Sequence, residues 1–114
     1  MTSYMILFPS PAMQVPAEEL PAVGEAARAV VREAKEAGVL VFAGGLDEGV
    51  APVLVSGDGT VTEGTYPQTR ELSGGLTIVD VPTPEEAARW AAKIAVACRC
   101  SQEVRAFADD PESH

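Results

Sequence analysis

The stretch from Leu76 to Cys98, LTIVDVPTPEEAARWAAKIAVAC, decides the fold because it holds a strand, a helix and a clear boundary between them. LTIVDV is rich in strand-forming residues and predicts a strand over Leu76–Val81. Thr83 is a preferred N-cap, Pro84 suits the first helical position, and the glutamate three residues after the threonine completes a capping box. A helix is therefore predicted to begin at Pro84 and to end by about residues 95–97.

The spacing of apolar residues predicts two amphipathic helices. The buried side of the helix that begins at Pro84 is expected to carry Ala87, Ala91, Ile94 and Cys98, with Trp90 near its edge. The earlier helix is expected to begin near Pro21, after a separate turn at residues 16–20, and to end at Gly38. Its apolar face is predicted to be formed by Val23, Ala27, Val30, Ala34 and Ala37.

Short apolar runs predict the remaining strands. They are Ser3–Phe8, Val39–Ala43, Pro52–Ser56 and Gln102–Phe107. Asp58-Gly59 is a strong hairpin signal, so the chain after Ser56 is predicted to turn back into a short ribbon at Thr60–Thr62. The strands at 39–43 and 52–56 are expected to pair with each other.

This order of elements predicts an α+β fold. A ferredoxin-like βαββαβ two-layer sandwich, with both helices on one face of an antiparallel sheet and an inserted hairpin, satisfies the order and the right-handed crossover rule. Residues 1–108 are expected to form one domain, and residues 109–114 a polar tail.

The strand sequences also predict a partner. YMILF and VLVF are apolar at consecutive positions, so both faces of their strands require burial, whereas two helices cover only one face. A homodimer packed sheet to sheet would cover the second face. The alternative is that the N-terminal segment and the long loop fold over that face within one chain.

Composition excludes several classes of function. A net charge of −9 with eight scattered Lys and Arg residues argues against nucleic acid. No apolar run is long enough for a membrane helix, and the start MTSYMILFPS lacks the pattern of a signal peptide, so a cytoplasmic location is expected.

Cys98 and Cys100 are expected to be reduced thiols in core or loop packing. Gly44-Gly45 predicts a turn, and Asp47-Glu48 a solvated loop; neither a cofactor nor a metal is expected.

The segment Gly57–Lys93 carries a resemblance. In order it contains Glu63-Gly64-Thr65-Tyr66, Thr69-Arg70-Glu71, Gly74-Gly75, Ile78-Val79-Asp80-Val81, Glu86-Ala87 and Trp90-Ala91. This series resembles the YCII-related, or DGPF-domain, family, in which Asp-Gly-Pro-Phe ends a hairpin. Thr-Lys-Glu, Gly-Gly, a strand closing in Ile-Asp-Val, and a helix with Glu-Ala and Trp-Ala then follow. Of the name-giving motif this sequence keeps only Gly64, and Arg70 replaces the lysine.

The resemblance implies a dimeric α/β barrel of ferredoxin-like subunits and does not imply one activity. Some YCII-type members have a His-Asp pair proposed as catalytic. That pair does not carry over, because the one histidine of this sequence is His114 in the polar tail.

The candidate site lies in the loop Thr62–Gly75. Glu71 and Glu63 are the candidate bases, Arg70 is an anchor for an anion, and Tyr66 is a hydrogen-bonding wall. Thr65 and Asp47 complete the predicted ligand contacts. Two alternatives stay open: Glu71 fixes the loop by accepting hydrogen bonds from backbone amides, and Tyr66 packs at the edge of the core.

Two functions are therefore predicted for this domain. The first is binding of a small organic molecule in a cleft beside residues 62–75, with proton-transfer activity of the isomerase or lyase kind that needs no cofactor. The alternative is a non-catalytic module that senses a metabolite or binds a protein. A redox role for Cys98 and Cys100 ranks third.

Overall fold

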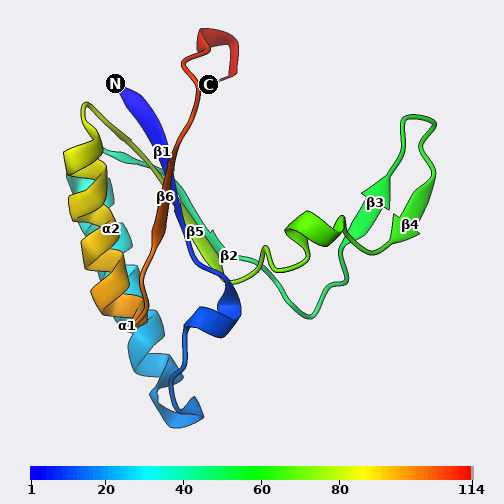
Figure 1. Cartoon of the computed structure of the whole chain (residues 1–114). Coiled ribbons are helices and arrows are strands. Elements are labelled where there is room, and N and C mark those ends of the chain that lie inside the picture. The colour runs from blue at the N-terminus through cyan, green and yellow to red at the C-terminus, as the bar shows by residue number, and fades with distance from the viewer. Residues whose placement is uncertain (114) are drawn as a thin grey trace.

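The computed structural model describes residues 1–113, and Figure 1 labels the helices and strands. The elements are β1 (Thr2–Leu7), α1 (Leu20–Glu36), β2 (Leu40–Gly45), β3 (Val53–Val55), β4 (Val61–Glu63), β5 (Gly75–Val81), α2 (Pro84–Cys98) and β6 (Glu103–Ala106). Short 3-10 turns occupy Ser10–Ala12, Ala17–Glu19, Pro67–Thr69 and Pro111–Ser113. Every strand and helix predicted from the sequence is present, with ends that differ by a few residues.

The main sheet has the order β2-β5-β1-β6, and all its neighbouring strands are antiparallel. Both helices lie on the same side of this sheet (Figure 1). The chain is therefore an α+β fold of two helices and an antiparallel sheet, as predicted. The four strands of this single chain form an open sheet and do not close into a barrel.

The core lies between the sheet and the helices. Tyr4 and Ile6 of β1 are buried, and so are Val79 and Val81 of β5. The predicted face of α2, Ala87, Ala91, Ile94 and Cys98, is buried against them. In α1, Val23 and Ala34 are buried and Ala27 and Val30 pack against the core, whereas Ala37 is exposed.

The boundary before α2 forms as the sequence predicts. Thr83 Oγ1 accepts a hydrogen bond from the backbone N–H of Glu86 at 3.2 Å. The Glu86 carboxylate itself lies 3.5 Å from Arg89. The helix extends to Cys98, slightly beyond the predicted end, and Arg99 ends it in the left-handed conformation with φ 59°.

The second face of the sheet is left open by the chain. Tyr4 pairs with Val79 and Met5 with Ile78, so the residues that alternate with the buried set point away from the helices. Met5 and Ile78 are only partly buried, and Phe42 is 57% exposed. The N-terminal segment does not cover this face, because Met13 packs against the core cluster on the helix side.

The predicted pairing of the strands at 39–43 and 52–56 is wrong. β2 pairs with β5, with an irregularity between Leu40 and Phe42, and β3 pairs only with β4 in a separate two-stranded sheet. The physical reason is that β2 forms five pairs with β5 at the edge of the core. β3 pairs with β4 instead, because a short turn joins the two strands and closing a short loop costs little entropy.

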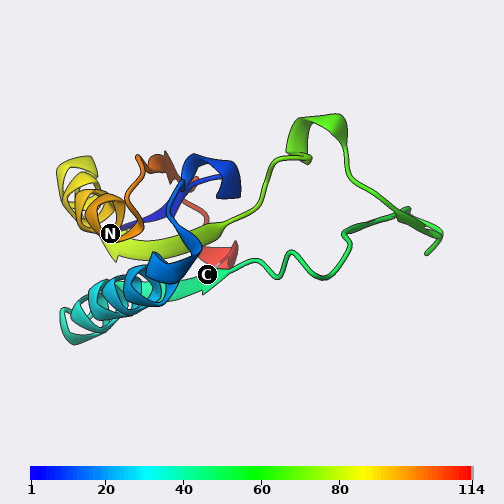
Figure 2. The ribbon, with the colours of Figure 1, turned by 90° about the horizontal axis from the view of Figure 1, so that it is seen from below.

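Residues Leu46–Gly74, called the arm below, project from the end of the main sheet (Figures 1 and 2). At its root Leu46 N–H donates to the Gly74 carbonyl at 2.8 Å. The predicted hairpin is present, and Gly59 adopts φ +88° in its turn. Within the described residues, no helix is long and apolar enough to cross a membrane.

Candidate functional site

A hollow of the molecule lies between α1, the segment that follows β1, and the adjoining ends of β2 and β5. Its volume is about 520 Å³, and we call it the α1 cavity. Its walls are mainly apolar and include Ile6, Phe8, Met13, Val23, Ala27 and Ile94. A hollow of this size and character is typical of sites for small organic ligands.

Two pairs of glycines line the side of the α1 cavity next to the arm. They are Gly44-Gly45 at the end of β2 and Gly74-Gly75 at the start of β5. Gly74 has φ +75°, and a Cβ there would lie 2.5 Å from the carbonyl oxygen of Phe8. The sequence therefore needs glycine at this position so that the chain can pass close to residues 8–10.

The polar residues of the α1 cavity are few. They are Ser10, Arg28, Glu48, Thr77 and Gln102. Ser10 Oγ donates to Glu48 Oε2 at 3.3 Å, and the Ser10 backbone N–H donates to Ser73 Oγ at 3.0 Å. These bonds connect the segment after β1 to both ends of the arm, so the wall of the cavity is assembled from distant parts of the sequence.

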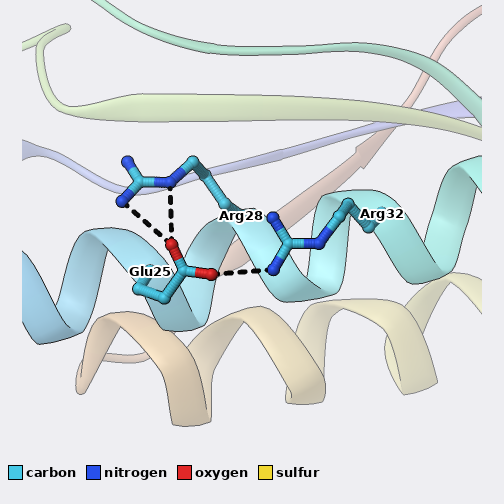
Figure 3. A network of polar contacts seen from close by, with 3 residues as sticks. All are labelled: Glu25, Arg28 and Arg32. Carbon is cyan, nitrogen blue, oxygen red and sulfur yellow. Dashed lines mark hydrogen bonds and ion pairs between the residues drawn. The ribbon is translucent and has the colours of Figure 1, made fainter.

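Arg28 is the cation of the α1 cavity, and its neighbours on α1 fix its position. Glu25 lies between Arg28 and Arg32 (Figure 3). Arg28 Nη2 is 3.2 Å from Glu25 Oε2, and Arg32 Nη2 is 2.8 Å from Glu25 Oε1. The bond from Arg32, and then the bond from Arg28, lower the pKa of the Glu25 carboxyl. One carboxylate shared by two guanidinium groups leaves donors free for an anionic ligand.

A second hollow of about 300 Å³ lies within the arm, and we call it the arm pocket. Three of the predicted ligand contacts, Thr65, Tyr66 and Arg70, line it together. Leu46, Leu54 and Leu72 are among its apolar residues. The Tyr66 side chain is 66% exposed, so it lies at the rim of this pocket rather than within a core.

The predicted acidic residues Glu63, Glu71 and Asp47 line neither hollow. All three are exposed. Asp47 Oδ1 accepts a hydrogen bond from the Gly49 backbone N–H at 2.9 Å, as in an ordinary turn. For Glu71 the backbone carbonyl accepts a hydrogen bond, from Ser73 Oγ at 3.3 Å.

The two cysteines are free thiols. Cys98 is buried and lines the α1 cavity, and Cys100 packs against the core cluster. Burial raises the pKa of both thiols, and the neighbouring Cys100 raises that of Cys98 further. A reactive cysteine requires the opposite shift, so this surrounding favours packing over redox chemistry.

Sequence reasoning missed the α1 cavity and its polar residues Arg28, Glu48 and Ser10. The two glycine pairs are its signal, because glycines on neighbouring strands leave space beside a helix. Taken singly, each pair indicates only a local turn or a family motif. Arg28 gave no signal of its own, because it occupies an exposed position in an amphipathic helix.

Comparison with known proteins gives one family. The family described as YCII-related domain matches residues 2–110 of the 114 in the chain. No curated protein matches the sequence.

Proposed function

Because the chain belongs to the YCII-related domain family, we propose that it binds a small organic molecule and that the α1 cavity is its site. The observation that carries this proposal is a largely apolar hollow of about 520 Å³ with a few polar side chains. The cavity adjoins Gly74-Gly75, so it lies beside the end of the loop that the sequence singles out. The apolar walls together with the cation Arg28 favour a ligand with an apolar body and one anionic end.

Arg28 and Glu48 give the two ends of the site different roles. Arg28 anchors the anionic group of the ligand through the donors that Glu25 leaves free. Phe8, Met13 and Ile94 contact its apolar part. Glu48 is the carboxylate that lines the cavity, and it is the candidate base if the bound molecule undergoes proton transfer.

Arg28→Gln and Arg32→Gln form a matched pair that tests this site. Both arginines pair with Glu25, but Arg28 lines the cavity and Arg32 does not. A thermal-shift screen against small organic acids is expected to give ligands that stabilise the wild type. At 100 times its dissociation constant, such a ligand contributes about 2.7 kcal/mol. This stabilisation should be lost in Arg28→Gln and kept in Arg32→Gln; equal binding by both variants would contradict the proposal.

The arm pocket is the second candidate site, since Thr65, Tyr66 and Arg70 meet around it. In this case Arg70 is the anion anchor, Tyr66 supplies a hydrogen bond from its hydroxyl, Asp47 is an outer ligand contact, and Glu71 or Glu63 is the base. The same screen separates the two sites. Stabilisation that survives Arg28→Gln and disappears in Arg70→Gln assigns the ligand to the arm pocket.

Two kinds of function remain for this site: an enzyme with isomerase or lyase-like activity, and a non-catalytic module that senses a metabolite or binds a protein. Conversion of the bound molecule distinguishes them. Turnover of a screening hit supports the enzyme. If Glu48→Gln abolishes turnover and leaves the thermal midpoint unchanged, Glu48 is the base and the reaction takes place in the α1 cavity. If Glu71→Gln gives this result instead, the base lies in the arm. Stabilisation without turnover supports the sensor.

We also propose a homodimer through the open sheet face, with ferredoxin-like subunits that together form an α/β barrel. The strand order β2-β5-β1-β6 and the exposure of Phe42 on the face opposite the helices support it. Sedimentation equilibrium of the wild type is expected to give a dimer at micromolar concentration, and Phe42→Glu a monomer. The control is Val96→Glu on α2, because Val96 is 81% exposed outside the sheet. A monomeric wild type would refute the dimer.

A cytoplasmic location is the remaining part of the proposal. The two unpaired thiols support it, because cysteines stay reduced in that compartment. Cell fractionation tests it, and recovery of the protein from an extracytoplasmic fraction would contradict it.

A further inference from the structure

Two opposite charges line the α1 cavity, and they do not pair with each other. Among residues 1–113, its charged lining residues are Arg28 on α1 and Glu48 near the root of the arm. Arg28 forms an ion pair with Glu25, whereas no ion pair of the described residues includes Glu48. Both charges are therefore available to a molecule in the cavity.

The Arg28 guanidinium lies beside Gly24, one turn earlier in α1. A Cβ at Gly24 would lie 3.5 Å from Arg28 Nη1, and both residues line the cavity. Arg28 Nε and Nη2 donate to Glu25 Oε2 at 3.3 Å and 3.2 Å. The third nitrogen, Nη1, makes no hydrogen bond within the described residues (Figure 3). Its two N–H groups can donate to an anion in the cavity.

The Glu48 carboxylate has an unused oxygen. Ser10 Oγ donates to Glu48 Oε2 at 3.3 Å, and no donor among residues 1–113 reaches Oε1. An ionised carboxylate accepts hydrogen bonds at both oxygens. Because Ser10 lines the cavity as well, this bond holds the carboxylate at the wall, where Oε1 can accept N–H donors from a ligand.

A ligand with a single charge matches only one of these two groups. A purely anionic molecule is attracted by Arg28, but it is repelled by Glu48 and by the net charge of −9. A purely cationic molecule is attracted by Glu48 and repelled by Arg28. A molecule that carries both charges places each one beside its opposite, and this complementarity selects it over either singly charged molecule.

We propose that the ligand of the α1 cavity is a zwitterion, namely an amino acid with an apolar body. This inference rests on the proposed function and narrows its ligand from an organic acid to an amino acid. The carboxylate of the ligand accepts from Arg28 Nη1, and its ammonium donates to Glu48. Its hydrocarbon part packs against Phe8, Met13 and Ile94.

Four molecules with six carbon atoms test each charge separately. Hexanoate carries only the carboxylate and hexylamine only the ammonium, whereas 2-aminohexanoate and 6-aminohexanoate carry both, at a short and a long separation. Dissociation constants are measured by NMR titration of the whole chain, through the backbone amides of Gly45 and Gly75 at the cavity wall. We expect one of the zwitterions to bind about fivefold more tightly than hexanoate or hexylamine, the effect of one exposed ion pair.

Glu48→Gln and Arg28→Gln assign each charge of the ligand to its partner. Glu48→Gln removes the negative charge and should weaken binding of the zwitterion about fivefold, while binding of hexanoate is kept or strengthened. Arg28→Gln should weaken binding of the zwitterion and of hexanoate, but not of hexylamine. The control is Glu36→Gln, the same change at an exposed residue of α1 that lines neither hollow, which should leave every dissociation constant unchanged. The same spectra show whether each variant keeps the fold.

The outcomes separate this inference from the proposed function. If hexanoate or hexylamine binds as tightly as both zwitterions, or if Glu48→Gln leaves binding of the zwitterion unchanged, the amino acid inference is overturned. Binding of hexanoate that depends on Arg28 then still supports the proposed site. If none of the four molecules shifts the cavity amides, the inference is likewise overturned, and the screen of organic acids decides the proposed function. Shifts confined to the arm pocket, around Tyr66 and Arg70, overturn both.

Discussion

At the scale of single residues, Gly74 shows how one position joins the arm to the fold. Its left-handed φ of +75° favours glycine, and the carbonyl oxygen of Phe8 leaves no space for a Cβ. We expect Gly74→Ala to lower the free energy of unfolding by at least about 1–3 kcal/mol, measured by urea denaturation. Gly57→Ala is the control, because a Cβ at Gly57 would meet nothing within 4 Å. If both substitutions changed the free energy of unfolding equally, the close approach of Gly74 to Phe8 would not contribute to stability.

At the scale of elements, the turn between β3 and β4 depends on Asp58. Hydrogen bonds from the side chain of Ser56, and then from Thr60, lower the pKa of Asp58 from 3.8 to about 2. Because folding lowers the pKa of Asp58, the ionised carboxylate stabilises the folded turn. This stabilisation is fully present above the pKa of the unfolded chain and is lost as the pH falls through about 2. The protection factor of the Thr60 amide, which donates to Asp58 Oδ1 at 2.9 Å, is therefore expected to fall between pH 4 and pH 2, measured as the hydrogen-exchange rate relative to that of an unstructured peptide at the same pH.

Ser56→Ala is the companion experiment for this turn. It removes the hydrogen bond with the largest effect on the Asp58 carboxyl, so an NMR titration should find the pKa of Asp58 closer to 3.8. A titration midpoint that stays at about 2 in Ser56→Ala would mean that the backbone of the turn, rather than the serine hydroxyl, holds the carboxylate.

At the scale of the whole molecule, the position of the arm distinguishes two ways to cover an apolar sheet. If the arm folded back over its own sheet, the monomer would be compact, with a radius of gyration of about 13 Å. The structure has the arm extended and gives 15.6 Å. Small-angle X-ray scattering of the monomeric Phe42→Glu variant should give a value nearer the larger figure. A value near the smaller one would support cover within one chain.

The sequence by itself determined the elements of this protein. The cap at Thr83, the left-handed glycine after α1 and the Asp58-Gly59 turn are local signals, and each depends on neighbours only a few residues away. Helical spacing likewise identified the buried face of α2. The three loop residues around the arm pocket could be grouped from the sequence because they lie within six positions of one another, Thr65 to Arg70.

Only the tertiary structure decided which strands pair and where the larger cavity lies. The pairing of β2 with β5 joins residues thirty or more positions apart, and no local signal distinguishes it from pairing with the nearer β3. The α1 cavity is assembled in the same way from Ser10, Arg28 and Glu48, which are unremarkable in their own segments. Local interactions fix the helices, strands and turns, whereas the hollow between them exists only after distant segments have met.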